Sequence, residues 1–416
     1  MRILFINRML SMERGGGETF DLEIARHLQQ LGCDISFLSG IPVLGSAKIR
    51  DPFSSFKFQV SSFHLRSPCF NWFPWDKVKG GWRLRVADFR MFESRATSWV
   101  RRREQDFDVI QVCELPFFVA RAKRQGVRVP IAMRLTAPNF YDPLGGMALA
   151  DAVIASGETV QQVRAGSRTD CHDIPNAVDT ELFKPHESSF RRSHTIPADA
   201  FVIVYVARFQ DFKNHALLLD AFARFLKTVP HARLVLVGSG PLKTRVMAQA
   251  DALGIAKEVL FLGEQPFPAL PQIYAASDVL AVSSDFESFC FAALEAMATG
   301  LPIVTTDCGW VPRLLGEREE MRDAGCEIRA AGKESEDREE SFGIRNSEFG
   351  IDLPGGIVVP CRDAEKLARA LSQLADNPEL RREMGRRNRE RAVRGHGWAS
   401  SAGKLLDVYK GLRRSF

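Results

Sequence analysis

The chain alternates short apolar runs with longer amphipathic segments, a pattern typical of parallel sheets covered by helices. The run at residues 3–6 is followed by a glycine-rich loop, an amphipathic segment from Phe20 to Leu28, and a second run at 35–38. This β–loop–α–β order predicts a Rossmann-like unit. Runs of the same kind predict strands near residues 108–112, 129–133, 151–155, 201–206, 233–237, 259–262, 279–282 and 355–359.

Breaks in this alternation predict the domain boundaries. The polar stretch 186–199, with Ser, Arg, His and Pro, is a linker candidate. We therefore predict an N-terminal Rossmann-like domain over residues 1–185, a second over 186–396, and a final amphipathic helix within 397–416 that begins near Trp398. Residues 317–341 are almost continuously charged and predict an exposed insertion, here bounded as 317–350.

Composition excludes few classes of function. Of the 416 residues, 45% are hydrophobic and 26% charged, and the net charge of +5 is too small to indicate nucleic acid binding. The eight cysteines include no C-x-x-C pair, which predicts reduced thiols in the cytoplasm. No Cys and His spacing is typical of zinc, so no metal is expected. No apolar run reaches the roughly 18–20 residues that span a bilayer.

Residues 48–103 differ from the rest of the chain in charge and aromatic content. They contain thirteen Lys or Arg against four Asp or Glu, a local charge of +9, and four of the six tryptophans. Basic residues interleaved with Trp and Phe suit an anionic membrane surface. They also suit single-stranded nucleic acid, whose bases stack on aromatic rings. The structural alternative is that the aromatics pack a pair of helices; of the two binding interpretations, the pattern favours the membrane.

Residues 283–302 hold two glutamates, Glu287 and Glu295, eight positions apart in a nearly apolar segment, with Asp285 shortly before the first. A helix that begins near Ser288 would place both on one side, with free backbone N–H groups beside Glu287 for a phosphate. Glutamates at this spacing usually mark a solvated stripe. A helix that is apolar all round is expected to be buried, however, and buried carboxylates need partners. The segment, ended by Gly300 and Pro302, therefore predicts a sugar-nucleotide site.

Two further loops are candidates for phosphate contact. Residues 15–17 are three glycines, which allow close approach of the backbone to a ligand, although a plain tight turn explains them equally well. The loop matches neither G-x-G-x-x-G nor a Walker motif. Arg208 follows the strand at 201–206, and Lys213 precedes the next helix. Two cations at the carboxyl end of a strand suit a diphosphate, and exposed loop charges are the alternative.

Taken together, these marks resemble the family 4 glycosyltransferases, or group 1 glycosyltransferases, over nearly the whole chain. The resemblance implies an α/β fold of GT-B architecture, with two Rossmann-like domains facing across a cleft and a C-terminal helix that crosses back to the N-terminal domain. It implies a retaining, metal-independent, hexosyltransferase-type enzyme without a cofactor, whose co-substrate is a nucleotide-diphosphate sugar. The matching motifs are Gly15-Gly16-Gly17-Glu18, Asn176-Ala177-Val178-Asp179 with Phe183, Arg208 with Lys213, Val237-Gly238-Ser239-Gly240, and the segment from Glu287 to Glu295.

The resemblance also implies roles for particular residues. Arg208 and Lys213 would hold the donor diphosphate and, with Glu287, make up the catalytic set. Glu287 with the backbone of residues 288–290 would bind the donor sugar, and Glu295 would bind the ribose. The donor-binding set is then Gly16, Gly17, Arg208, Lys213, Gly238, Ser288, Phe289, Cys290 and Glu295.

The chain departs from the family pattern in the charged insertion after Gly316 and at two further places. Gly309 is followed by Trp310 and later Arg313, where the family often has a second glycine and a glutamate. The histidines that often follow the middle N-terminal strands are absent, and Glu114 is a candidate acceptor-side substitute. The base and sugar of the donor therefore stay open.

The resulting prediction is transfer of a sugar to a glycan, lipid-linked or small-molecule acceptor, in the cytoplasm or at the inner face of the cytoplasmic membrane, without nucleic acid as a partner. The alternatives are a GT-B sugar-nucleotide epimerase or phosphorylase, and a non-catalytic scaffold that binds sugar nucleotide or glycan.

Overall fold

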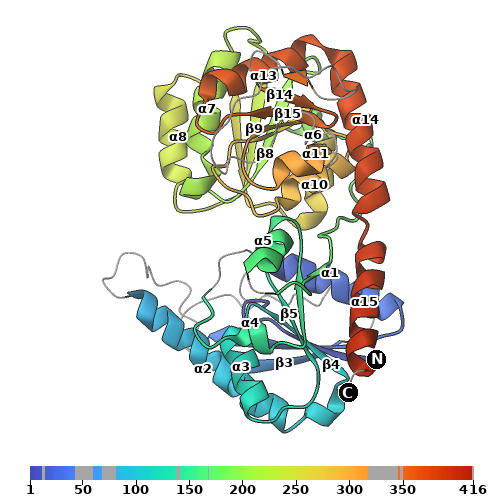
Figure 1. Cartoon of the computed structure of the whole chain (residues 1–416). Helices are drawn as coiled ribbons and strands as arrows, with labels where there is room; N and C mark the ends of the chain where they lie inside the picture. The colour runs from blue at the N-terminus through green and yellow to red at the C-terminus, as the bar shows by residue number, and fades with distance from the viewer. Residues whose placement is uncertain are drawn as a thin grey trace. The chain divides into compact units, whose positions relative to one another are not determined.

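The structure is a computed structural model, and it describes residues 1–11, 15–42, 60–67, 81–136, 141–166, 168–316, 345–346 and 350–414. The chain divides into two compact units, Met1–Ala177 with Trp398–Phe416, and Val178–Gly397. In each unit, helices cover a largely parallel sheet (Figure 1). The predicted α/β class with two Rossmann-like units is confirmed. The insertion predicted at 317–350 lies almost wholly outside the described residues.

The first sheet is parallel throughout its described strands, in the order β3-β2-β1-β4-β5-β6-β7. Its interior strand β1 is almost entirely apolar and buried, as the hydrophobic run predicts. The order of strands along the chain reverses between β1 and β4, and loops at such a reversal commonly bind ligands. The strands are β1 (Arg2–Ile6), β2 (Asp34–Pro42), β3 (Ser61–Ser67), β4 (Val109–Cys113), β5 (Ile131–Arg134), β6 (Ala152–Ala155) and β7 (His172–Asp173).

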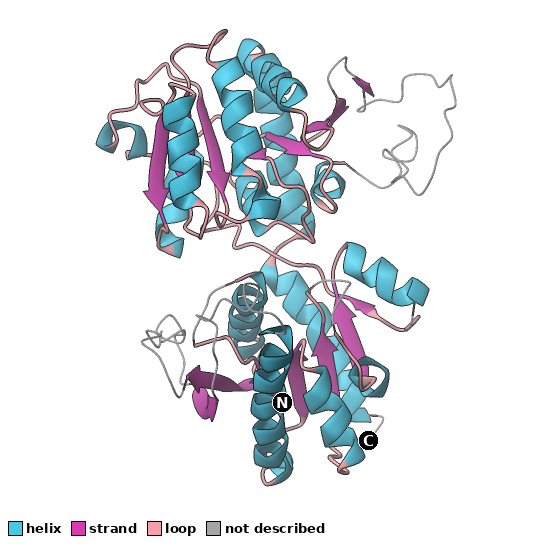
Figure 2. Cartoon of the chain, turned by 90° about the vertical axis from the view of Figure 1, so that its left-hand side faces the viewer, coloured by secondary structure: helices cyan, strands magenta, loops and turns pink. Residues whose placement is uncertain are grey.

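Helices lie on both sides of the strands in this unit (Figure 2). The last helix of the chain, α15, is one of them: the ring of Trp398 meets the ring of Phe20 edge-on at 5.6 Å, and the hydroxyl of Tyr409 donates a hydrogen bond to Gln111 Oε1 of β4. The helices are α1 (Gly16–Gln30), α2 (Gly81–Arg101), η2 (Glu104–Asp106), α3 (Pro116–Arg124), α4 (Gly146–Leu149), α5 (Glu158–Gly166) and α15 (Trp398–Arg414).

The second sheet has the order β10-β9-β8-β11-β12-β15-β14-β13. Its first six strands are parallel, and β14 and β13 pair antiparallel at one edge. The reversal of strand order falls between β8 and β11. The strands are β8 (Val202–Val206), β9 (Arg233–Val237), β10 (Val259–Gly263), β11 (Val279–Val282), β12 (Ile303–Thr306), β13 (Arg345–Asn346), β14 (Ile351–Leu353) and β15 (Gly356–Val359).

The helices of the second unit end with a long polar helix, α14, which buries Met384 and Asn388. None of the helices in the described part of the chain is long and apolar enough to cross a membrane. The helices are α6 (Phe190–Ser193), η3 (Asp211–Lys213), α7 (His215–Phe225), α8 (Lys243–Ala252), η4 (Phe267–Ala269), α9 (Leu270–Ala275), α10 (Phe291–Ala298), α11 (Val311–Leu315), α13 (Ala364–Asp376) and α14 (Pro378–Gly395).

The boundary between the units differs from the predicted one at residue 185. The stretch 186–199, predicted as a linker, belongs to the second unit, because Phe190 is buried there and Arg191 pairs with Asp278 at 2.7 Å. The division falls after Ala177 instead. The chain passes from one unit to the other at two points, after Ala177 and after Gly397. These points are adjacent, because the N–H of Val178 donates to the carbonyl of His396 at 2.8 Å.

Candidate functional site

The candidate site of the second unit lies at the carboxyl ends of β8 and β11, which are adjacent and parallel. The loop after β8 carries Arg208 and Lys213, and the loop after β11 carries residues 283–287. Strand order reverses between these two strands, so their loops diverge and leave room for a ligand. The sheet therefore brings together two of the sequence-predicted groups that lie some seventy residues apart.

Lys213 and Glu287 form an ion pair at the centre of this site. Lys213 Nζ lies 2.6 Å from Glu287 Oε1, and their side chains are 18% and 7% exposed. Ser284 Oγ donates to the same carboxylate oxygen at 2.7 Å. Glu287 Oε2 has no hydrogen-bond partner among the described residues, so one oxygen is anchored and the other is available to a ligand hydroxyl.

Tyr205 and the serine pair hold the backbone of Lys213 in place. The Tyr205 hydroxyl donates to the Lys213 carbonyl at 2.9 Å and lies 2.8 Å from Ser284 Oγ. Ser283 Oγ donates to the same carbonyl at 3.1 Å. Burial raises the pKa of Tyr205 well above its usual value, so the hydroxyl keeps its proton. The sequence analysis noted the serines but missed Tyr205. The only sequence signal for Tyr205 is a hydroxyl-bearing side chain within an otherwise apolar strand.

Gly309 makes close contact with the backbone of Glu287. Its φ is +72°, and a Cβ there would lie 2.2 Å from the Glu287 carbonyl oxygen. The N–H of Trp310 donates to that carbonyl at 3.2 Å. The segment after β12 thus fixes the position of Glu287, and only glycine fits at 309. The Arg313 guanidinium lies over the Trp310 ring, 5.1 Å from its centroid.

The predicted helix start near Ser288 is wrong. Helix α10 begins at Phe291, because Cys290 takes a left-handed conformation with φ of 73° that ends the preceding loop. Glu287 is therefore a loop residue and does not share a helix face with Glu295. Glu295 is buried on α10, where its Oε2 accepts a hydrogen bond from the Tyr274 hydroxyl at 2.8 Å. Both carboxylates have the buried, partnered surroundings that the apolar segment predicts.

Arg208 lies on a loop that packs against the predicted glycine turn. Gly238 has φ of +135°, and a Cβ there would lie 2.1 Å from the carbonyl oxygen of Ala207. The N–H of Phe209 donates to the Ser239 carbonyl at 3.0 Å. Arg208 itself is exposed. Gly238 thus supports the backbone that presents Arg208.

His215, the first residue of α7, braces the same loop from within. Its ring stacks on Phe209 with centroids 4.2 Å apart and lies 4.9 Å from the Tyr205 ring. Burial lowers its pKa to about 4, so the ring is neutral at physiological pH. His215 is a second packing residue that the sequence analysis missed.

The N-terminal candidates for ligand contact, Gly16, Gly17 and Glu114, all belong to the first unit. Gly16 and Gly17 open α1, and a Cβ on Gly17 would lie 3.4 Å from Cys113 Sγ. Glu114 follows β4 with φ of 50°, and its Oε1 accepts the backbone N–H of Thr136 at 2.7 Å. These residues meet at the carboxyl ends of β1, β4 and β5, the ligand edge of the first sheet. Arg14 lies outside the described residues.

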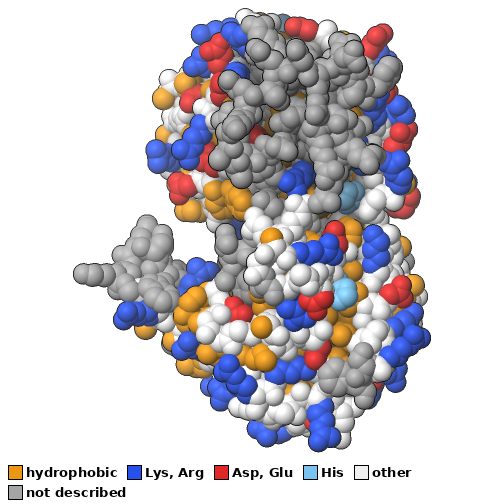
Figure 3. All heavy atoms as spheres, viewed as in Figure 1, with side chains coloured by type: hydrophobic (Ala, Val, Ile, Leu, Met, Phe, Trp, Pro, Cys, Tyr) orange, Lys and Arg blue, Asp and Glu red, His pale blue; other side chains and the backbone are white. Residues whose placement is uncertain are grey.

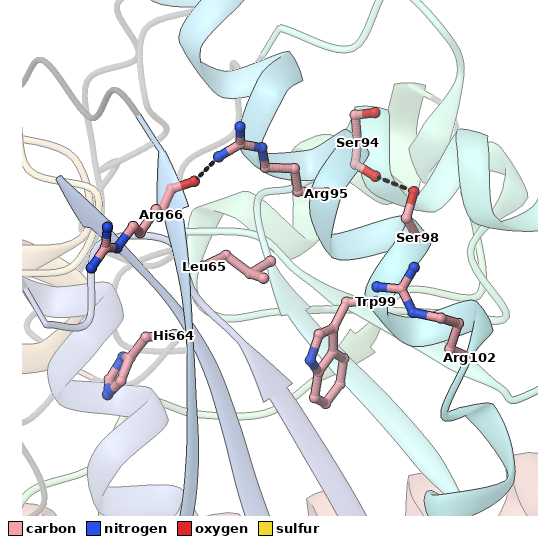
Figure 4. Close-up of a pocket in the computed structure, with 8 residues that line it drawn as sticks. All are labelled: His64, Leu65, Arg66, Ser94, Arg95, Ser98, Trp99 and Arg102. Atoms are coloured by element: carbon pink, nitrogen blue, oxygen red, sulfur yellow. Dashed lines mark hydrogen bonds between the residues drawn. The ribbon is translucent and has the colours of Figure 1, made fainter. Parts of the chain in front are cut away.

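The window 48–103 is described only in part, and Trp72 and Trp75 lie outside the described residues. In the described part, Phe92 and Trp99 are buried, which fits the packing alternative for these two aromatics. A cavity of about 350 Å³ lies between β3 and α2. Figure 4 shows Arg95 of α2 donating to the carbonyl of Arg66 in β3. Lys and Arg are scattered among Asp and Glu on the visible face of the molecule (Figure 3).

No group of three or more His, Cys, Asp or Glu in the described ranges could hold a metal ion. The charged groups that the sequence predicts for this site are one carboxylate and two cations on loops, with a second carboxylate on α10. Cations of this kind suit phosphate oxygens, and carboxylates suit hydroxyls.

Parts of the chain are similar to known glycosyltransferases. Residues 187–325 match the family described as "Glycosyl transferases group 1", and residues 353–407 match a "Glycosyl transferase-like" family. The D-inositol 3-phosphate glycosyltransferase of Saccharomonospora viridis is 32% identical over 253 residues, which cover 58% of this chain and 50% of that relative. The putative glycosyltransferase EpsF of Bacillus subtilis is 33% identical over 168 residues, 39% of this chain and 43% of that protein. The chain spans about half the length of the curated relatives it matches.

Solved structures share the whole fold. Sucrose-phosphate synthase from Thermosynechococcus elongatus has a TM-score of 0.72 at 19% identity and covers all of both chains. Anabaena HepE in complex with UDP and glucose has a TM-score of 0.71 at 19% identity, over 99% of this chain and 100% of that one. The fold is therefore GT-B. The match of residues 187–325 is to the group 1 glycosyl transferases, the family that the sequence resembles.

Proposed function

We propose that the chain is a retaining, metal-independent glycosyltransferase of family 4 that moves a hexose from a nucleotide-diphosphate sugar to a glycan, lipid-linked or small-molecule acceptor. The single observation that carries the proposal is the Lys213–Glu287 ion pair at the ligand edge of the second sheet. It lies within the segment matched by the group 1 family.

In the proposed reaction the bond from the sugar C1 to the diphosphate oxygen breaks, and a bond from C1 to the acceptor oxygen forms. The nucleoside diphosphate leaves with the bonding electrons, and its departing oxygen takes the proton that the acceptor hydroxyl loses. Lys213 donates one N–H to Glu287 and has two more for phosphate oxygens. Arg208 adds a second cation, and preorganised cations stabilise the charge that develops on the leaving group.

The remaining predicted residues have supporting places in this scheme. Glu287 Oε2 would accept a hydroxyl of the donor sugar, beside the backbone of Ser288, Phe289 and Cys290. Glu295, oriented by Tyr274, would accept the ribose hydroxyls. Gly16 and Gly17 would also contact the donor, and Glu114 would take part on the acceptor side. No cofactor is needed, because the energy of transfer comes from the nucleotide sugar.

A thermal-shift panel of UDP-, GDP-, ADP- and dTDP-sugars tests the proposal and identifies the donor. The cognate donor is expected to raise the melting temperature, since a ligand at 100 times its Kd stabilises the native state by about 2.7 kcal/mol. UDP-glucose is the first to test, because HepE binds it. Lys213→Met should abolish the shift, whereas Lys184→Met, an exposed lysine of the same unit, should keep it.

A panel without any shift in the wild type would contradict the proposal. The donor, once found, also separates the alternatives. An epimerase would interconvert it without an acceptor, a phosphorylase would need inorganic phosphate, and a scaffold would bind it without turnover. Inositol phosphate belongs in the acceptor panel, because it is named for the Saccharomonospora relative.

We further propose that the chain works in the cytoplasm, at the inner face of the membrane, through residues 48–103 and without nucleic acid. Arg83 and Arg85 of α2 are exposed, as cations that meet anionic lipid must be. The protein is expected to float with phosphatidylglycerol vesicles at low salt, and to be released by salt and by Trp72→Ala with Trp75→Ala. Phosphatidylcholine vesicles are the control. Flotation that neither salt nor the two substitutions reduce would count against this contact.

A further inference from the structure

Two phenylalanine rings near the Lys213–Glu287 ion pair are exposed, and Lys213 Nζ lies 5.2 Å from the ring centroid of one of them, Phe212. Phe212 is 43% exposed and Phe286 is 47% exposed. Each directly precedes one partner of the pair in the sequence. A single exposed aromatic is ordinary, but two beside the same polar site indicate a surface that a ligand covers.

The two loops that carry these rings are fixed to each other. The N–H of Asp285 donates to the carbonyl of Phe212 at 2.8 Å, and Asn214 Nδ2 donates to Asp285 Oδ1 at 3.1 Å. Arg362 contacts the same carboxylate at 3.3 Å. The rings therefore stand on a braced backbone, and a ligand that covers them has little loop entropy to overcome.

Burial rises from these rings toward the floor of the site. Ser284 is fully buried, Glu287 is buried, Lys213 is partly buried, and the two rings are exposed. In the proposed function, on which this inference rests, the donor contacts the inner groups. The outer rings are then left for the second substrate.

The surroundings of the rings identify the kind of second substrate. Asp285 and Arg362 lie beside them, so the exposed apolar surface is interrupted by charge. A lipid chain needs continuous apolar surface. A sugar ring has one C–H face that packs on an aromatic ring and hydroxyls at its edge that bond to charged groups. We propose that Phe212 and Phe286 bind the C–H face of a sugar ring of the acceptor, with its hydroxyls toward Asp285 and Arg362.

The test uses two double variants. One carries Phe212→Ala and Phe286→Ala, and the control carries Met247→Ala and Leu253→Ala, at two exposed apolar residues of the same unit. Binding to an array of immobilised oligosaccharides is measured with and without UDP. Each ring is expected to contribute roughly tenfold to sugar binding, as one aromatic contact typically does. The control pair and the conservative Phe212→Tyr with Phe286→Tyr should bind as the wild type does. The thermal shift by the donor should be equal in all four proteins.

Three results would overturn the proposal. A donor shift that falls along with sugar binding would place the rings on the donor, and unchanged sugar binding in the alanine variant would leave the rings without a role. Wild-type protein that binds phosphatidylglycerol vesicles through these rings, and no oligosaccharide, would make the occupant a lipid. A missing donor shift in the wild type is a different failure: it contradicts the proposed transfer, while the array without UDP still reports on the rings.

Discussion

Replacing Lys213 by methionine is expected to lower sugar transfer by about 10³-fold, as removal of one preorganised donor to a developing charge typically does. The lysine lies 2.6 Å from Glu287 and is the inner of the two site cations. The same change also leaves a buried carboxylate without its ion partner, which costs about 3 kcal/mol of stability or more. Activity and stability therefore fall together in the single variant and must be separated.

A double-mutant cycle separates them. Glu287→Gln removes the unpaired charge, so Lys213→Met with Glu287→Gln should regain most of the stability lost in Lys213→Met. Transfer, measured as kcat/KM for the stabilising donor, should stay about 10³-fold down in all three proteins. If transfer recovers in the double variant as the melting temperature does, the pair is a structural ion pair and its assignment to the donor is wrong.

Substituting Gly309 by alanine is expected to destabilise the second unit by about 3 kcal/mol and to lower transfer roughly a hundredfold. A Cβ at this position would lie 2.2 Å from the Glu287 carbonyl oxygen, so the segment must move and take Glu287 with it. A displacement of 1 Å in a catalytic group is enough for a loss of this size.

Gly254→Ala is the matched control, because its φ is also +72° but no atom lies within 4 Å of the added Cβ. It should show only the cost of a left-handed alanine, about 1 kcal/mol, with unchanged transfer. Equal melting temperatures and equal turnover in the two variants would mean that the contact with Glu287 does not matter.

The sequence predicted the elements of this fold better than their connections. Apolar runs gave the central strands, because a parallel strand buried on both faces leaves a nearly continuous hydrophobic pattern. The edge strand β3 was not predicted, since it alternates polar and apolar residues as an exposed edge does. The stretch 186–199 looked like a linker because Phe190 and Arg191, which tie it to the second unit, are outnumbered by polar neighbours.

For the site, too, the sequence predicted individual residues better than the contacts between them. Lys213 and Glu287 were predicted from loops and motifs, and adjacent parallel strands bring them together. The start of α10 was not predictable, because Cys290 takes a left-handed conformation that its residue type disfavours. Tyr205 was missed because its role depends on the strand order, which places it beside Ser284. Local sequence pattern therefore predicts individual residues and elements, whereas contacts across the sheet determine which of them lie together.

The return of α15 to the first unit makes that unit discontinuous in the sequence, whereas the second unit is the single segment Val178–Gly397. Excision of the second unit therefore needs two cuts, at neighbouring points, because Val178 and Gly397 form a β-bridge. Joining Ala177 to Trp398 through a short glycine linker would retain Tyr409 and its hydrogen bond to Gln111 in an isolated first unit. A simple truncation after Ala177 would instead remove a helix that covers its core. The chain is thus organised as one domain inserted into another. Each unit can be prepared separately only by dividing the chain both after Ala177 and after Gly397.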